Sequence, residues 1–302
     1  MLTAAAYFTA DSAAEIELRE LADALYRRID WRWAQHDGVC VTHGWKPECG
    51  YLNYGWEGYS EALLLYVLGL GSPTHALTEP SFKAWTVTYQ WENLYGQDFL
   101  YAGPLFIHEF SHAWIDFRGI RDRFMREKDC DYFENSRRAT YVQREYAIRN
   151  PHSFIGYGEA AWGLSAGDGP SVAAQTVAGR CQAFYGYAAR GVPYGPDDGT
   201  VAGSAMLASL VFAPEIVLPA ARALYERTTQ DEDRLLHASG FNRTINAPDA
   251  DGCIAGGEFG LDQGIIVLML ENYRSGLLWR VGRTCPYIQL GLRRAGFTGG
   301  WL

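Results

Sequence analysis

The sequence predicts a single all-α domain. Three observations support this fold class. Apolar residues recur at helical spacing in several long segments of the 302-residue chain. No stretch alternates apolar and polar residues over a length sufficient to predict a sheet. Irregular loops rich in glycine, aromatic and acidic residues join the predicted helices, and such loops are typical of binding sites.

Seven segments carry the helical pattern. Asp11 predicts the N-cap of the first helix, in which apolar residues follow at helical spacing up to Ile29. The segment 62–70 is apolar on all sides, which predicts a buried helix. The remaining predicted helices span residues 80–91, 104–116, 132–149, 214–227 and 262–273.

Composition narrows the classes of partner. The net charge of −9 and the pI of about 5.3 argue against nucleic acid or an anionic membrane as a partner. No apolar run is long enough to predict a transmembrane helix, and residues 1–6 lack the pattern of a signal peptide. The chain contains 10 Trp and 19 Tyr, whose rings pack against sugar rings and whose polar groups bond hydroxyls. These features favour a neutral oligo- or polysaccharide as the partner. They do not indicate a cellular compartment.

Glu61 is the first candidate catalytic residue. It stands immediately before the apolar segment 62–70, and the next polar residue after it is Tyr66. This position predicts a side chain that points into the protein or a cleft. The alternative is an acid that only complements the dipole of the helix that follows.

Glu159 is the second candidate. Its neighbours in the segment 155–164 are glycine, alanine and aromatic residues, which predicts a poorly solvated carboxyl with a raised pKa. Such a group suits a general acid, and cleavage of a glycosidic bond needs two carboxyl roles. The alternative is a carboxylate that only caps neighbouring backbone N–H groups.

Further polar residues are secondary candidates. Asp116 ends an aromatic helix, and Asp168 lies in an acidic, glycine-rich loop. Glu134 and Arg137 stand three residues apart on one helical face, where an ordinary ion pair is the alternative to a role in binding.

A zinc site is the sharpest rival hypothesis. His108-Glu109-Phe110-Ser111-His112 matches HExxH, in which two histidines on one helical face bind zinc and the glutamate activates water. Glu134 is a candidate third ligand. The chain has no phosphate-binding GxxxxGK[ST] loop and no GxSxG serine-hydrolase motif.

A series of motifs resembles the glucoamylase-like domain family that includes bacterial endo-β-1,2-glucanases. More distantly, they resemble the transglycosylating domain of cyclic β-1,2-glucan synthases. The matching motifs occur in order along the chain, at residues 44–48, 58–62, 70–75, 103–106, 117–122, 132–137, 156–159, 162–164, 197–200 and 271–276.

The resemblance implies an (α/α)6 toroid that cleaves β-1,2-glucan internally, without a metal or organic cofactor. It implies that Glu61 is the general acid and that Glu159 positions water or binds substrate. In the transglycosylating relatives the aligned glutamates are acid/base and nucleophile, whereas the hydrolases are thought to invert configuration. The residues expected to line the cleft or bind substrate are Trp56, Trp114, Asp116, Glu134, Arg137, Trp162, Asp168 and Asp198.

The chain departs from the family pattern in three ways. Ser60 stands where members carry Asn, and Glu109 stands where they carry a non-acidic residue, which favours an accidental HExxH match. Family domains begin well before a segment like 2–8, so residues 1–302 are expected to form one catalytic domain that lacks the first helices of the toroid. An inactive glucan-binding module therefore stays open as a further alternative.

Overall fold

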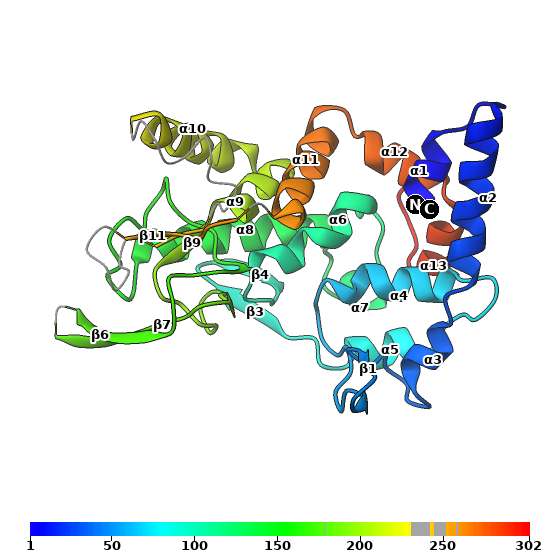
Figure 1. Cartoon of the computed structure of the whole chain (residues 1–302), viewed down its shortest axis with the longest axis horizontal. Coiled ribbons are helices and arrows are strands. Elements are labelled where there is room, and N and C mark those ends of the chain that lie inside the picture. The colour runs from blue at the N-terminus through cyan, green and yellow to red at the C-terminus, as the bar shows by residue number, and fades with distance from the viewer. Residues whose placement is uncertain (178, 231–241, 245–251, 258) are drawn as a thin grey trace. The chain divides into compact units, whose positions relative to one another are not determined.

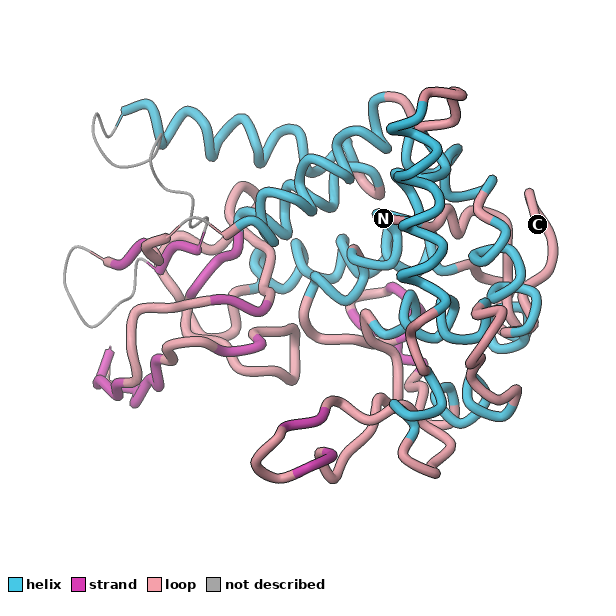
Figure 2. The backbone as a smooth tube through the Cα atoms, turned by 45° about the vertical axis from the view of Figure 1, so that its right-hand side comes forward, coloured by secondary structure: helices cyan, strands magenta, loops and turns pink. Residues whose placement is uncertain are grey.

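The computed structural model describes residues 1–177, 179–230, 242–244, 252–257 and 259–302. In these ranges the chain is rich in helices and its strands are short (Figures 1 and 2). Contacts divide the chain into two units. Unit 1 comprises residues 1–90, 110–134 and 275–302, and unit 2 comprises residues 91–109 and 135–274.

Short antiparallel sheets correct the expectation of a purely helical chain. The paired strands in the described ranges are β1 (Trp45–Lys46) with β2 (Gly50–Tyr51), β3 (Trp91–Leu94) with β4 (Gln97–Leu100), β5 (Ala166–Gly167) with β8 (Ala188–Ala189), β6 (Ala173–Val177) with β7 (Arg180–Phe184), and β10 (Asn242–Thr244) between β9 (Thr200–Ala202) and β11 (Cys253–Ile254). Each strand has two to five residues, which is too short for alternation to be recognised in sequence.

Unit 1 is built mainly of short helices. They are α1 (Leu2–Tyr7), α2 (Ala13–Arg27), α3 (Trp31–Gln35), α4 (Ala62–Gly71), α5 (Pro80–Thr86), α6 (Phe110–Trp114), α7 (Arg123–Glu127), α12 (Leu277–Thr284) and α13 (Pro286–Arg294). Helix α2 begins one residue later than predicted, because the Ser12 side chain rather than Asp11 accepts the N–H of Glu15, at 3.3 Å. Helix α5 ends at Thr86 rather than 91, and Trp91 begins β3.

Helix α4 is buried, as predicted, and two glycines let α13 approach it closely. A Cβ on Gly71 would lie 2.1 Å from the carbonyl oxygen of Tyr287. A Cβ on Gly291 would lie 1.9 Å from the carbonyl oxygen of Val67. Any side chain at either position would push the helices apart, so backbone contact fixes α4 and the residues at its start.

Aromatic rings fill the interior of unit 1 beside α4. Tyr66 stacks on Trp85 with ring centroids 5.1 Å apart, and Tyr132 packs on Phe297 at 5.8 Å. The Tyr132 hydroxyl donates to the carboxylate of Asp122, at 2.9 Å. Many of the aromatic residues counted in the sequence therefore form core contacts rather than a sugar-binding surface.

Unit 2 contains most of the strands and the longer helices. Helix α8 (Tyr132–Arg149) has the predicted bounds and begins with its first three residues in unit 1. The other helical segments of unit 2 are η1 (Leu105–His108), α9 (Gly203–Ala208), η2 (Ser209–Val211), α10 (Pro214–Gln230) and α11 (Gly260–Arg274). No helix of the described ranges combines the length and apolarity that crossing a bilayer requires.

Candidate active site

Glu61 stands at the N-cap position of α4 in unit 1. Its side chain is partly buried, and burial raises the pKa of its carboxyl above the usual value. Within the described part of the chain no arginine or lysine forms an ion pair with it. The environment therefore keeps a proton on Glu61 to a higher pH than a surface glutamate would.

Ser111 on α6 holds the backbone at the start of α4. Its hydroxyl donates to the carbonyl oxygen of Glu61, at 3.2 Å, and accepts the N–H of Leu64, at 3.1 Å. The N–H groups of a first helical turn have no carbonyl four residues earlier within the helix, and Ser111 supplies an acceptor for that of Leu64. Ser111 thus fixes the backbone from which the Glu61 side chain projects.

Two predicted tryptophans of unit 1 are partly exposed. Trp56 stacks on His43, with ring centroids 3.9 Å apart and an interplanar angle of 15°. Burial lowers the pKa of His43, which favours the neutral ring in this stack. Trp114 ends α6. Both rings keep surface that a sugar could contact.

Asp116 is buried and held by arginines. Arg118 donates to both carboxylate oxygens, at 2.8 and 2.7 Å, and Arg283 donates to Oδ2. Burial alone would raise the pKa of Asp116, but the hydrogen bonds from the arginines outweigh it and lower the pKa. Asp116 therefore orders the two guanidinium groups, and Arg118 also stacks on Trp279 at 4.3 Å.

Glu134 and Arg137 fall in different units. Glu134 lies in the first turn of α8, and its N–H donates to Asp131, at 2.8 Å. Arg137 donates to Glu215 on α10, at 2.9 Å, and its guanidinium lies 5.1 Å from the ring centroid of Tyr141. Arg137 thus pairs with an acid on α10 and packs on the Tyr141 ring, which lies four residues further along α8.

Glu159 differs from its prediction. Its side chain is 75% exposed, and Oε1 lies 3.3 Å from the guanidinium of Arg144. Backbone hydrogen bonds in both directions between Gly158 and Ala161, each 3.2 Å, place Glu159 at the tip of a tight turn. The prediction that small and aromatic neighbours exclude water from Glu159 is wrong, because the turn projects its side chain into solvent.

A pair of tyrosines fixes the loop that carries Glu159. Tyr157 donates to one oxygen of Asp197, at 2.6 Å, and Tyr146 on α8 donates to the other, at 2.7 Å. The segment before Glu159 is thereby joined to α8 and to the loop that precedes β9.

Asp198 is structural rather than substrate-facing. Arg190 donates to its two oxygens, each at 2.7 Å, and the N–H groups of Tyr185 and Thr200 also donate to it. The side chains of Asp198 and Arg190 are 0% and 1% exposed. Burial raises the pKa of Asp198, but the Arg190 hydrogen bonds outweigh this effect and lower it. The prediction that Asp198 binds substrate is contradicted, because no oxygen is left to face a ligand.

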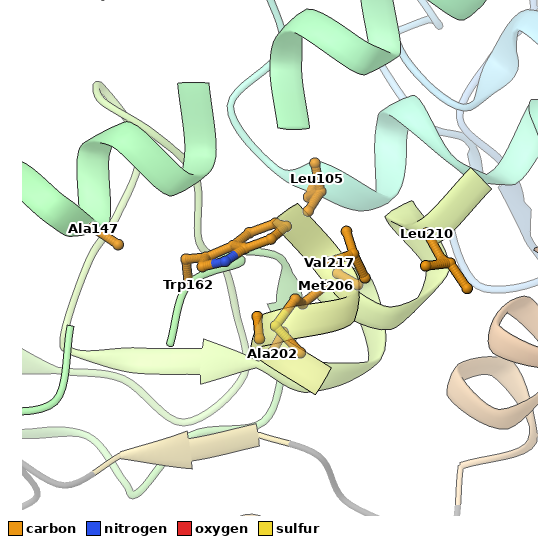
Figure 3. Packing of buried hydrophobic residues seen from close by; sticks show 9 residues of the cluster. Leu105, Ala147, Trp162, Ala202, Met206, Leu210 and Val217 are labelled. Carbon is orange, nitrogen blue, oxygen red and sulfur yellow. The ribbon is translucent and has the colours of Figure 1, made fainter. Parts of the chain in front are cut away.

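Trp162 is also a core residue (Figure 3). It is fully buried among apolar side chains of unit 2. Its cluster comprises Leu105, Ala147, Ala202, Ala205, Met206, Leu210, Val217 and Ala220. Gly163, which follows the ring, has φ +104°, a backbone conformation that residues with a side chain rarely adopt. This packing contradicts the prediction that Trp162 lines the cleft.

Asp168 keeps part of its surface and lies near a second acid. Burial and the charge of Asp168 together raise the pKa of Asp262 on α11. Asp168 is therefore close enough to Asp262 for its charge to act on that carboxyl.

The HExxH match does not have zincin geometry. His108 ends η1 and α6 begins at Phe110, so the motif is divided between two helical segments. Nε2 of His108 lies 3.3 Å from the carbonyl oxygen of Ala102, and burial lowers the pKa of its ring to about 4. Glu109 is buried, accepts the hydroxyl of Ser209 at 2.9 Å, and has a pKa raised well above its usual value by burial. Glu109 thus faces Ser209 in the interior rather than an open metal site, and the described residues contain no group of three potential metal ligands.

Sequence reasoning missed Ser111 and Asp197 as organising residues. In the sequence Ser111 stands inside the HExxH match and Asp197 directly before Asp198, and neither position indicates a partner. Both act through contacts with residues 40 or more positions away, which local patterns do not report.

Comparisons with known proteins identify the relatives. The family model Glycoamylase, described as "Putative glucoamylase", matches residues 53–286. The chain is 24% identical over 327 residues to the exo β-1,2-glucooligosaccharide sophorohydrolase of Parabacteroides distasonis. That match covers 97% of the chain but only 41% of the relative, so the chain spans about two fifths of its length.

Solved structures agree with this match. A Bacteroides uniformis structure named "putative glucoamylase" has a TM-score of 0.85 and 31% identity, over 100% of this chain and 69% of that one. The endo-β-1,2-glucanase of Chitinophaga pinensis, solved with sophorotriose and glucose, has a TM-score of 0.77 and 28% identity, over 100% and 69%. Since the family model covers well over half of its residues, the chain belongs to the Glycoamylase family.

Proposed function

We propose that this protein is a glycoside hydrolase that cleaves β-1,2-glucan within the chain, with Glu61 as its general acid. The observation that carries the proposal is the partly buried Glu61 carboxyl, which has a raised pKa and no pairing cation among the described residues. The activities for which the sophorohydrolase and the endo-β-1,2-glucanase are named support the substrate class. We also propose the (α/α)6 toroid that the family resemblance implies as the arrangement of its helices.

In the proposed reaction Glu61 donates its proton to the glycosidic oxygen as the bond from that oxygen to the anomeric carbon breaks. A water molecule attacks the anomeric carbon and loses a proton to a base. Glu159 is proposed to position this water or to bind the sugar. Its side chain is 75% exposed and lies 3.3 Å from the guanidinium of Arg144, so it can reach a water molecule or a sugar hydroxyl.

The remaining predicted contacts support substrate orientation. Trp56 and Trp114 offer ring surface, and Glu134, Arg137 and Asp168 offer partly exposed polar groups. Asp116 is proposed to bind substrate only indirectly, through Arg118. The Arg118 side chain is 49% exposed, and Asp116 holds its guanidinium in place.

Replacement of the two glutamates tests the proposal. Glu61→Gln is expected to lower the release of reducing ends from β-1,2-glucan by about 10²–10⁴-fold, because the amide cannot donate the proton. Glu159→Gln is also expected to lower turnover by orders of magnitude. Glu79→Gln, an exposed glutamate before α5, is the control and should leave the rate unchanged.

Circular dichroism and thermal melting of each variant separate loss of chemistry from loss of fold. Near-normal rates for both Glu61→Gln and Glu159→Gln would overturn the assignment. Binding of β-1,2-glucan by the wild type without any reducing-end release would instead favour the inactive binding module.

A further inference from the structure

Aromatic rings that are exposed or partly exposed lie around α3 and the β1–β2 hairpin of unit 1. We name Trp33, His36, Trp45, Tyr51 and Tyr54 the aromatic surface. Trp33, Trp45 and Tyr54 are 54%, 47% and 59% exposed, which is unusual for side chains of this size. Trp33 lies 6.2 Å from Trp45 and 5.1 Å from Tyr51 between ring centroids. His36 stacks on Tyr51 at 3.9 Å.

The rings of the aromatic surface are held in place by the backbone. In the β1–β2 hairpin Trp45 pairs directly with Tyr51, and the Tyr51 hydroxyl donates to the carbonyl oxygen of Trp33, at 2.9 Å. The Asp30 side chain accepts the N–H of Trp33, at 2.9 Å, and caps α3. The platform is therefore pre-organised, so a ligand loses little affinity to ordering these rings.

A cavity of about 900 Å³ adjoins the aromatic surface, in a part of unit 1 where α3, the β1–β2 hairpin and α5 lie near one another (Figure 1). His36, Tyr51 and Tyr54 line it, so the rings and the cavity form one continuous region. Asn53 and Glu57 add polar groups to the wall, and both are exposed.

This combination of groups matches carbohydrate chemistry. Aromatic faces pack against the C–H faces of pyranose rings, and amide and carboxylate groups bond the hydroxyls. The aromatic surface itself carries no acidic side chain, and Glu57 is an acid on the cavity wall that can accept hydrogen bonds from hydroxyls. Glu61 does not line the cavity, so binding there would not engage the proposed acid.

We propose that the aromatic surface and its cavity form a second glucan-binding site, which holds a β-1,2-glucan chain without taking part in bond cleavage. The proposal takes only its substrate class from the proposed function. The site adds affinity for long chains, whereas short oligosaccharides are hydrolysed without it.

The test uses Trp33→Ala/Trp45→Ala in the Glu61→Gln background, with linear β-1,2-glucan as the titrated ligand in calorimetry. Loss of two aromatic platforms is expected to weaken binding about tenfold. Tyr225→Ala, an exposed aromatic on α10 of unit 2, is the matched control and should bind as the parent does. Trp33→Phe/Trp45→Phe should keep most of the affinity, which separates ring stacking from any loss of fold.

Kinetics in the active background complete the test. The double alanine variant should raise KM for the polymer and leave kcat on sophorotriose unchanged. Unchanged affinity for the polymer in that variant would overturn the inference. So would an altered oligomeric state in sedimentation with normal glucan binding, which would assign the surface to a second copy of the chain. Full activity of Glu61→Gln would refute the proposed catalysis and leave the binding result to be judged on its own.

Discussion

Glu61 at the start of α4 and Glu159 in the loop of unit 2 have opposite surroundings. Glu61 is partly buried, has no cation paired with it in the described ranges, and has a raised pKa. Glu159 is 75% exposed at a turn tip and faces Arg144. Both residues have apolar neighbours along the chain, yet only Glu61 is partly shielded from water. The difference supports the proposal that the proton donor lies at the start of α4, and that the exposed acid of the loop has another role.

Asp198 extends the comparison to a carboxylate that is both buried and paired, and its loss has the largest expected effect. Asp198→Asn would leave Arg190 charged and buried beside a neutral amide. We expect a loss of about 3–5 kcal/mol in the free energy of unfolding, measured by denaturant titration. Asp129→Asn breaks a 2.6 Å pair with Arg121 in which Asp129 is 94% exposed, and should cost far less. Equal losses of unfolding free energy in the two variants would refute the claim that burial makes the Asp198–Arg190 pair the more important one for stability.

The pH dependence of activity sharpens the contrast between the two glutamates. Glu61 donates a proton, so it works below its pKa and fails above it. Because burial raises that pKa, kcat/KM should start to fall at a pH above the usual glutamate value, by about tenfold for each further pH unit. The residual activity of Glu159→Gln should still fall at high pH in this way. The residual activity of Glu61→Gln should not show this fall, the basic limb of the pH profile. A limb that disappears only in Glu159→Gln would reverse the two assignments.

Replacing Ser111 is expected to have a smaller effect, and it tests whether this residue positions Glu61. Ser111→Ala removes one donor and one acceptor at the first turn of α4, which is expected to lower stability by about 1 kcal/mol. If the hydroxyl positions Glu61, kcat should fall several-fold while KM for β-1,2-glucan stays near the parent value. Ser111→Thr keeps a hydroxyl and should restore kcat. A drop in stability with kcat unchanged would leave Ser111 with a structural role alone.

Helices with a strong local signal could be predicted from the sequence. The wholly apolar segment after Glu61 became the buried α4, and the bounds of α8 match the prediction. The family followed from motifs spread along the chain, and the match over residues 53–286 confirms it. In each case the information lies within neighbouring residues or in a series of short matches.

Exposure and partners at the site could not be predicted in the same way. A glycine-rich sequence does not specify whether a turn projects Glu159 outward or buries it. Trp162 has the composition of a ligand-facing ring, but packing from α9 and α10 covers it. Asp198 meets Arg190 eight positions earlier, and no local rule distinguishes that buried pair from a pair of surface charges. These properties depend on tertiary contacts between distant segments.

The tyrosine pair on Asp197 has a consequence for the energetics of the exposed Glu159. An exposed loop ordinarily loses conformational entropy when it closes on a ligand, at about 1–2 kcal/mol per residue that becomes fixed. Tyr157, two residues before Glu159, is already bonded to the carboxylate that Tyr146 also binds. Folding has therefore already met part of that entropic cost, so the backbone beside Glu159 is held in place although its side chain is exposed.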